Sequence, residues 1–306
     1  PSANADAVTT PVTLDPTALA FNWDAAALQQ RLQVIVPGTT VEVRAEAGST
    51  NTELLERQRR ATPTAPAGEA PAPVWLVAER QTAGRGRLGR SWWSEPGSTL
   101  TCSLGLALEP ADWSGLSLAV GLAVAEALDP PDPPRPGGGE PGSSGSARIG
   151  LKWPNDLWLR SDDRKLAGIL IEAQALRGSA AGARGSLARW AVVGIGVNLR
   201  PPRGEGGEFR TGYACLDELE PGITAPGALQ RIAPAVLAAL QRFEREGLAP
   251  LLAAYARRDV LAGRRASAGD LVGRVTGIAP GGELCLRDDA GQTHRIASGE
   301  VSVRPC

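Results

Sequence analysis

The sequence predicts an α+β protein built from a mixed sheet with helices, followed by a small all-β module. Up to about residue 262, strand-like apolar runs are interspersed with stretches of helical periodicity. From residue 266 onward only short strand-like runs separated by glycine turns remain. With 306 residues and a hydrophobic content of 42%, the chain can bury one large core and one small core. This combination is typical of the α+β class.

The first half of the chain is expected to hold three helices and three strands. Residues 1–40 form a weakly patterned extension, with one short helix at 24–32 for which Asp24 is the expected N-cap. Thr50 and Glu53 have the spacing of a capping box, so Thr50 is the expected cap of the next helix. The remaining elements are expected at 41–44 (strand), 52–60 (helix), 74–79 and 100–108 (strands), and 116–128 (helix).

The second half begins with a low-complexity stretch at 129–147, which we expect to be a flexible insertion because it is rich in Pro, Gly and Ser. Strands are predicted at 147–152, 156–160, 166–173 and 190–198, the last three forming a meander around a polar tip at 178–186. Two helices follow at 225–247, where Pro234 is a candidate interruption, and at 248–261. The final strands are expected at 271–278, 283–288, 293–298 and 300–303. The predicted domains are therefore 41–262 and 266–304.

Composition excludes several classes of function. The net charge of −1 gives no basic field for DNA or for an anionic membrane. The four cysteines form no C-x-x-C pair, so we expect neither a metal site in the protein nor a disulfide framework, and a cytoplasmic location. The only histidine, His294, has no G-x-S-x-G motif beside it, which argues against a Ser-His-Asp hydrolase. No apolar run is long enough to span a membrane.

The segment 81–90, QTAGRGRLGR, is the most informative part of the chain. Its three glycines permit sharp bends, and Arg85, Arg87 and Arg90 suit a phosphate or carboxylate ligand. Gly84, Gly86 and Gly89 also match the dinucleotide-binding spacing G-x-G-x-x-G. Too few residues separate the loop from the next strand for the crossover helix that this fingerprint requires, so we reject that interpretation.

Three further segments place cations and amides at strand ends. They are 152–156 (KWPND), 164–172 (RKLAGILIE) and 194–198 (GIGVN). Together with GSTN at 48–51 and the arginine loop, these segments resemble the ordered motifs of the biotin protein ligases. The resemblance covers about residues 41–304. It implies a catalytic domain related to class II aminoacyl-tRNA synthetases, with a C-terminal SH3-like barrel.

The resemblance also implies a reaction. Members of this family use ATP, with Mg²⁺, to convert biotin to biotinyl-5′-adenylate. They then transfer the biotinyl group to one lysine of a biotin carboxyl carrier protein, such as the acetyl-CoA carboxylase subunit. Residues 1–40 contain no basic recognition helix, so a monofunctional enzyme without DNA binding is expected. A homodimer is a candidate assembly.

Roles for individual residues follow from the resemblance. Ser49, Thr50 and Gln81 would bind the ureido ring of biotin, with backbone contact from Gly84. Lys165 would stabilise the reacting carboxylate and α-phosphate, Arg87 would close over the adenylate, and Asp156 is a candidate base or orienting group for the acceptor lysine. The other expected binding residues are Asn51, Arg85, Gly86, Arg90, Trp93, Lys152, Asn155, Gly168, Gly196 and Asn198.

Two other functions stay open at this point. A lipoate or octanoate ligase shares the catalytic fold, although the arginine loop suits the biotin group better. A nucleotide- or RNA-binding module could also use an Arg/Gly loop, but the module at 266–304 lacks aromatic residues alternating with basic ones.

Overall fold

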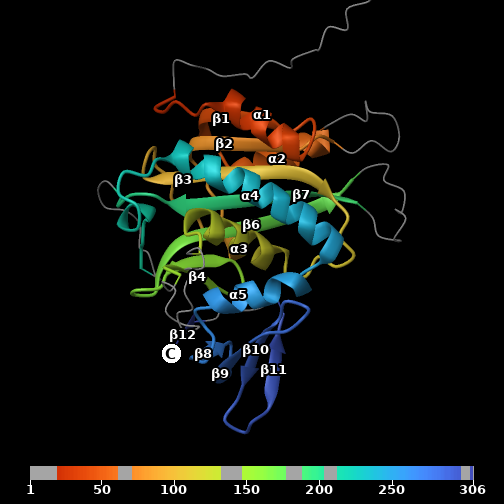
Figure 1. The fold of residues 1–306 in the computed structure, drawn as a ribbon, viewed down its shortest axis with the longest axis vertical. Helices are drawn as coiled ribbons and strands as arrows, with labels where there is room; N and C mark the ends of the chain where they lie inside the picture. Colours follow the sequence, from red (N-terminus) through yellow and green to blue (C-terminus); the bar gives the residue numbers. More distant parts are fainter. Residues whose placement is uncertain are drawn as a thin grey trace, which may run out of the picture.

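The computed structural model describes residues 19–60, 71–131, 147–176, 188–202 and 212–297, and the backbone of Arg304 and Pro305. Among these residues a seven-stranded mixed sheet carries helices on both faces, and a five-stranded antiparallel sheet follows it at the bottom of Figure 1. The α+β class and the order of its two parts are confirmed.

The large sheet has the strand order β1-β2-β3-β7-β6-β5-β4. Only β1 and β2 pair in parallel, and the other described neighbours are antiparallel. Adjacent β5, β6 and β7 form the predicted meander. The strands are β1 (Thr40–Ala47), β2 (Val74–Gln81), β3 (Thr99–Leu108), β4 (Ile149–Lys152), β5 (Asp156–Leu159), β6 (Arg164–Ala175) and β7 (Arg189–Asn198).

Helices cover the two faces of this sheet unequally. Helices α1 (Ala25–Ile35), α3 (Leu116–Leu128) and α4 (Ala225–Glu246) share the main apolar core with one face. Helix α2 (Thr50–Arg60) packs on the other face, where Leu54 and Leu55 meet Leu76 and Val192. Neighbouring residues of a strand point to opposite faces of the sheet. Strand side chains that point to the α2 side, where α2 does not cover them, can therefore line a site.

The short helix predicted at 24–32 is confirmed as α1, whereas two capping predictions need correction. Leu28 and Leu32 of α1 are fully buried, so this helix belongs to the main core although residues 1–40 looked weakly patterned. Asp24 has a left-handed backbone and makes no side-chain cap. Helix α2 begins at Thr50, and the hydroxyl of Ser49 accepts the N–H of Thr52 at 3.4 Å, so Ser49 is the capping residue instead of Thr50.

The later helices also differ from the pattern. Pro234 lies inside α4 without ending it. The second helix, predicted at 248–261, is a 3₁₀ turn at Ala249–Leu251 followed by the short helix α5 (Leu252–Arg258).

The predicted insertion starts later than its composition indicates. Asp129 is buried, and its carboxylate accepts hydrogen bonds from the guanidinium of Arg258 at 3.0 Å and from the N–H of Ile149 at 3.1 Å. Asp129 therefore belongs to the core, because the ion pair holds it against β4 and α5. The rest of the insertion, from 132 to 146, and the tip at 178–186 lie outside the described residues.

The C-terminal sheet has the order β11-β10-β9-β8-β12. Its strands are β8 (Arg265–Ala268), β9 (Leu271–Ile278), β10 (Leu284–Arg287), β11 (Thr293–Ile296) and β12 (Arg304–Pro305). Strand β8 was missed by the pattern, and the strand expected at 300–303 lies outside the described residues. The indole N–H of Trp153 donates to the carbonyl of Gly282 at 2.9 Å, which joins this sheet to the main body.

Candidate functional site

A cavity lies on the α2 face of the large sheet, beside the N-terminus of α2. Its floor follows the strand register: Ser103, Gly194 and Leu170 are cross-strand neighbours in β3, β7 and β6. In the next row, Gly196 of β7 pairs with Gly168 of β6. Glycines at these positions lower the floor and leave room for a group above the sheet.

The structure brings eleven of the predicted site residues to this cavity. They are Ser49, Thr50, Asn51, Gln81, Arg85, Gly86, Arg87, Asn155, Lys165, Gly168 and Gly196. Six predicted residues do not line it: Gly84, Arg90, Trp93, Lys152, Asp156 and Asn198.

The polar end of the cavity is built by the turn between β1 and α2. Ser49, Thr50 and Asn51 are buried there although their side chains are polar. The side-chain carbonyl of Gln81 accepts the backbone N–H of Thr50 at 2.8 Å, which fixes the end of β2 against α2. Buried polar groups of this kind need hydrogen-bond partners, and Gln81, Ser103 and Glu172 supply them to Thr50 and Asn51.

The arginine loop is a closed hairpin. The N–H of Gly86 donates to the carbonyl of Arg90 at 2.7 Å, and the N–H of Trp92 donates to the carbonyl of Gly84 at 2.9 Å. A Cβ atom on Gly84 would lie 2.4 Å from the carbonyl oxygen of Trp92. Gly84 is therefore required for loop closure, whether or not its backbone also meets a ligand.

Arg87 projects from this loop toward the sheet. Its guanidinium donates to the side-chain oxygen of Asn155 at 2.9 Å, and Asn155 is in turn held by the carbonyl of Ile169 at 2.8 Å. Burial lowers the pKa of the Arg87 guanidinium, Asp156 opposes this shift, and Arg90 adds to it. An arginine stays protonated despite such a shift, so Arg87 brings a partly desolvated positive charge to the cavity.

Lys165 is the second cation of the site. Its ammonium lies 2.8 Å from the carboxylate of Asp156 and 5.6 Å from the centre of the Trp92 ring. Asp156, although outside the lining, thus acts on the cavity through Lys165. The other lysine of the chain, Lys152, is only 5% exposed and lies 4.8 Å from the ring of Trp158. Its expected contact with the triphosphate stays a prediction.

The aromatic wall of the cavity is Trp92, whereas the sequence favoured Trp93. A Cβ atom on Gly196 would come within 2.3 Å of the Trp92 ring, and one on Gly168 within 3.1 Å. Trp93 instead packs edge-on against Tyr213, with ring centres 6.4 Å apart. The hairpin explains the difference, because the bond from Trp92 to Gly84 turns the first indole inward.

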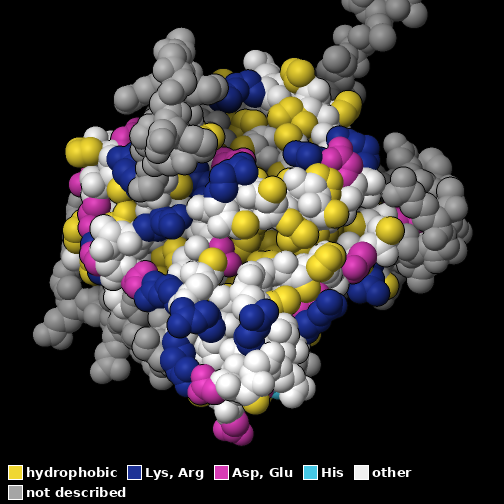
Figure 2. All heavy atoms as spheres, turned by 60° about the horizontal axis from the view of Figure 1, so that its bottom comes forward, with side chains coloured by type: hydrophobic (Ala, Val, Ile, Leu, Met, Phe, Trp, Pro, Cys, Tyr) yellow, Lys and Arg dark blue, Asp and Glu magenta, His cyan; other side chains and the backbone are white. Residues whose placement is uncertain are grey.

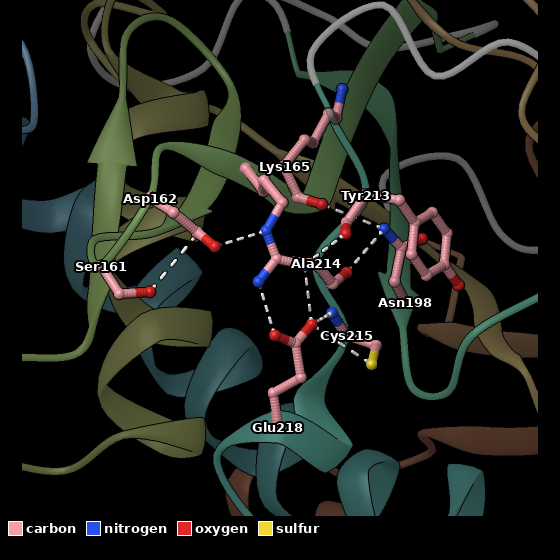
Figure 3. A network of polar contacts seen from close by, with 9 residues as sticks. Ser161, Asp162, Lys165, Asn198, Tyr213, Ala214, Cys215 and Glu218 are labelled. Atoms are coloured by element: carbon pink, nitrogen blue, oxygen red, sulfur yellow. Dashed lines mark hydrogen bonds and ion pairs between the residues drawn. The ribbon is translucent and has the colours of Figure 1, made fainter.

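Asn198 lies outside the cavity, where its amide holds the backbone. It donates to the carbonyl of Lys165 and to that of Ala214, both at 3.1 Å (Figure 3). The N–H of Ala214 also donates to the carbonyl of Lys165, at 2.9 Å. Asn198 therefore fixes the start of β6, and its direct contact with nucleotide is not supported by this arrangement.

A network of ion pairs and hydrogen bonds also anchors the start of β6. The guanidinium of Arg164, the residue before Lys165, pairs with both oxygens of Glu218 and with Asp162 at 2.6 Å (Figure 3). Its hydrogen bonds are the main reason why the pKa of Glu218 lies below its usual value. Glu218 also accepts the N–H of Cys215 at 2.9 Å, so segment 213–218 is tied to the strand that carries Lys165.

Several lining residues were not predicted: Trp92, Cys102, Ser103, Ile169, Leu170, Gly194 and Ile195. Ser103 could have been found, since it is a polar residue inside the apolar run 100–108. Burial raises the pKa of the Cys102 thiol to about 12, so this cysteine is a neutral part of the floor. Within the described ranges, no group of three or more His, Cys, Asp or Glu could hold a metal ion, and no described helix is long and apolar enough to cross a membrane.

Comparison with protein families gives two matches. Residues 51–187 match the biotin/lipoate A/B protein ligase family, and residues 263–304 match the biotin protein ligase C-terminal domain. The first range contains α2 from Asn51 onward, the arginine loop and Lys165, and the second contains most of the C-terminal sheet.

Relatives match over most of the chain. The bifunctional ligase/repressor BirA of Escherichia coli is 34% identical over 273 residues, which are 87% of this chain and 75% of BirA. The biotin–[acetyl-CoA-carboxylase] ligase of Mycobacterium tuberculosis is 33% identical over 85% of this chain and 88% of its own length. The solved biotin protein ligase of Aquifex aeolicus, in complex with biotin and ATP, shares the fold with a TM-score of 0.62 at 24% identity, over 87% of this chain and 99% of that one.

Proposed function

Because the chain belongs to the biotin protein ligase family, we propose that it uses ATP to form biotinyl-5′-adenylate and transfers biotin to a carrier-protein lysine. The carboxylate of biotin attacks the α-phosphate of ATP and pyrophosphate leaves. The acceptor amine then attacks the acyl carbon of the mixed anhydride and AMP leaves. The acceptor is a biotin carboxyl carrier domain of acetyl-CoA carboxylase or a related carboxylase.

The observation that carries this proposal is the combination of groups in one cavity. Neutral partners at Ser49 and Thr50, which are buried, and at Gln81, which is half-buried, suit a cyclic urea, which is uncharged and both donates and accepts. The cations of Lys165 and Arg87 suit a carboxylate that is joined to a phosphate. Biotin carries the urea and the carboxylate in one molecule.

The proposed role of Lys165 is to stabilise the negative charge that grows during adenylation. Its ammonium is already oriented by Asp156, so little reorganisation is needed during the reaction. Asp156 is proposed to orient Lys165 first and then to accept a proton from the acceptor lysine, which is almost entirely protonated at neutral pH. Mg²⁺ would arrive on the triphosphate oxygens, which are its preferred ligands.

Lipoate activation is the nearest alternative, since the matching family contains both kinds of ligase. The match to the biotin protein ligase C-terminal domain favours biotin. An RNA-binding module is less favoured, because in Figure 2 the Lys and Arg side chains around the C-terminal sheet are interspersed with Asp and Glu.

Exchange of pyrophosphate into ATP tests the proposal. We expect exchange to require biotin and to be at least about a hundredfold slower with lipoate, because a site built for polar partners rejects analogues that lack them. Equal rates with the two acids would contradict the substrate assignment. Absence of exchange with either acid would contradict the ligase function.

A further inference from the structure

A continuous series of hydrogen bonds, buried at its centre and partly buried at both ends, connects β6 to the ligand-facing side of the cavity. It runs from Glu172 through Asn51 and Ser103 to Thr50, where Gln81 adjoins it. Ser103 is fully buried, and Thr50 and Asn51 are only 3% and 4% exposed. Hydroxyl groups shielded from water must direct their protons within the protein, so the direction of each bond can be worked out.

The orientation of the Asn51 amide is fixed at one end of the series. Its nitrogen donates to the carboxylate of Glu172 at 2.9 Å and to the carbonyl of Leu170 at 3.2 Å. Both partners are acceptors, so the reversed amide would set its own oxygen against two other oxygens. A Cβ atom on Gly194 would lie 2.2 Å from the Asn51 oxygen, which shows that this glycine makes room for the amide.

The orientation of the Asn51 amide determines which group donates in the next two hydrogen bonds, up to Thr50. The hydroxyl of Ser103 donates to the side-chain oxygen of Asn51 at 2.6 Å. Its single proton is used there, so at its other contact, 2.6 Å from the hydroxyl oxygen of Thr50, Ser103 can only accept. The single proton of Thr50 is therefore directed to Ser103 and away from the cavity.

This direction leaves two acceptors together at the cavity. The hydroxyl oxygen of Thr50 lies 3.2 Å from the side-chain oxygen of Gln81, which already accepts the backbone N–H of Thr50. With the Thr50 proton turned toward Ser103, these two oxygens have no proton between them. A ligand N–H can donate to both, and an unpaired acceptor pair is unfavourable without one.

We propose that Glu172, Asn51 and Ser103 are positioning residues that make the Thr50 hydroxyl an acceptor and so select a ligand with an N–H at this point. The inference rests on the proposed function, in which that N–H belongs to the ureido ring of biotin. The carboxylate of Glu172 cannot donate while ionised, so it sets the direction of every later bond. Asn51 thus acts on the ligand through Ser103 and Thr50.

Ser103→Ala tests this inference. Without Ser103, the Thr50 hydroxyl can turn its proton to Gln81, and the acceptor pair is lost. We expect the KM for biotin in pyrophosphate exchange to rise roughly tenfold to a hundredfold. The KM for ATP and kcat should change by less than about threefold, because the reacting groups are not touched.

Thr101→Val is the matched control. Thr101 lies on the same strand and is equally buried, its hydroxyl donates to the carbonyl of Ala78 at 2.7 Å, and it does not line the cavity. Both variants lose a buried hydrogen bond and should lose stability. Only Ser103→Ala should change the KM for biotin. Equal effects of the two variants on that KM would overturn the inference.

Biotin analogues that carry a methyl group on one ureido nitrogen test which N–H of the ligand faces Thr50. For the analogue whose methyl group replaces the N–H facing Thr50, Ser103→Ala should raise the KM by less than about threefold, since the donor is already missing. For the analogue methylated on the other nitrogen, Ser103→Ala should raise the KM by the same factor as for biotin. The same penalty for biotin and both analogues would overturn the proposed selection.

Ser103→Cys covers the case in which Ser103→Ala does not fold. Its thiol is similar in size and is a weaker donor and acceptor, so the KM for biotin should rise in the same direction by a smaller factor. Wild-type protein without biotin-dependent exchange would contradict the proposed function. Active wild-type protein with an unchanged KM in both Ser103 variants would contradict only the inference drawn here.

Discussion

Lys165 and Asp156 face each other at 2.8 Å, with 27% and 17% of their side chains exposed. The carboxylate thus restrains the ammonium before any ligand binds. A preoriented cation stabilises a developing anion more than a mobile one does, because it does not have to reorganise during the reaction. This pair is the reason why we predict a large effect on rate for the single lysine at the start of β6.

Lys165→Ala should slow biotin-dependent pyrophosphate exchange by about a hundredfold or more, equivalent to about 3 kcal/mol of transition-state stabilisation. Circular dichroism should show an intact fold, since the side chain is partly exposed at a strand end. Arg31→Ala, which removes a cation of α1 that donates to Gln230 on α4, is the control and should not slow exchange. A near wild-type rate for the Lys165 variant would refute its assigned role.

At the scale of the residue, the sequence predicted most of the residues that line the cavity, and the structure adds which groups of the protein some of them bond. The family resemblance predicted that Thr50, Gln81 and Lys165 would bind one ligand, and all three line the cavity. Asn198 and Asn51 were assigned to ligands, whereas their amides are bonded to carbonyl or carboxylate groups of the protein. Which way an amide points depends on strands distant in sequence, so it could not be predicted from the motif.

The arginine loop is the element on which retention of the intermediate should depend. Its hairpin is closed by two backbone hydrogen bonds, and Arg87 bonds to Asn155 across the cavity. Arg87 therefore connects the loop to the turn after β4. A loop fixed at both its base and its tip can cover a bound adenylate more completely than one fixed at the base alone.

Arg87→Gly should give an enzyme that forms the adenylate but releases it. Loss of charge-assisted bonds worth roughly 1.5–3 kcal/mol should reduce retention about tenfold to a hundredfold. The measurement is biotinylation of serum albumin added as a bystander, at matched adenylation rates. Arg80→Gly, which removes an exposed arginine paired with Glu46, is the control. If bystander labelling does not increase, Arg87 does not help to retain the adenylate.

Element boundaries were predicted correctly where the local sequence alone determines where an element begins and ends. The bounds of α3 match the prediction, because an apolar run with a glycine before it defines a buried helix. Helix α1 was underestimated, since its two fully buried leucines depend on packing against α4 and β1. Strand β8 was missed because it is four residues long.

A buried ion pair that the sequence did not reveal joins distant parts of the chain in the whole molecule. Asp129 follows α3 and Arg258 ends α5, and their side chains are 8% and 5% exposed. Arg258 also donates to the carbonyl of Ile149 at 2.9 Å. Three elements that are distant in sequence therefore meet at one charge pair.

Asp129→Asn should destabilise the protein by about 3–5 kcal/mol, because it leaves the Arg258 charge buried without its partner. The measurement is urea unfolding at several pH values. Asp112→Asn, which alters an exposed turn, is the control and should unfold like the wild type.

The pH dependence of this effect has a defined sign. Burial raises the pKa of Asp129, but hydrogen bonds from Ile149, Arg258 and Arg148 outweigh it and leave the pKa below its usual value of 3.8. The stabilisation is therefore complete above that value and is lost as the pH falls through the lower, folded-state pKa. The difference between wild type and Asp129→Asn should be constant from pH 5 to 8 and should shrink in stronger acid. A difference that stays constant into strong acid would contradict this.

The order of the strands was the least predictable feature of the whole molecule. The meander β5-β6-β7 follows from short connections, which favour adjacent antiparallel strands. The parallel pairing of β1 with β2, and the position of β7 beside β3, depend on contacts between distant segments. Only the family resemblance indicated a single site shared by these strands.

The two lysines of the chain have one more consequence. Nearly all of its 32 basic residues are arginines, Lys152 is almost fully buried, and Lys165 is bound to Asp156. An acyl adenylate modifies neutral amines, whereas a guanidinium stays protonated and does not attack it. Mass spectrometry after incubation with biotin and ATP, without an acceptor, should find hardly any biotin on this protein's side chains, even in Arg87→Gly. The protein carries its positive charge in a chemical form that its own product leaves unmodified.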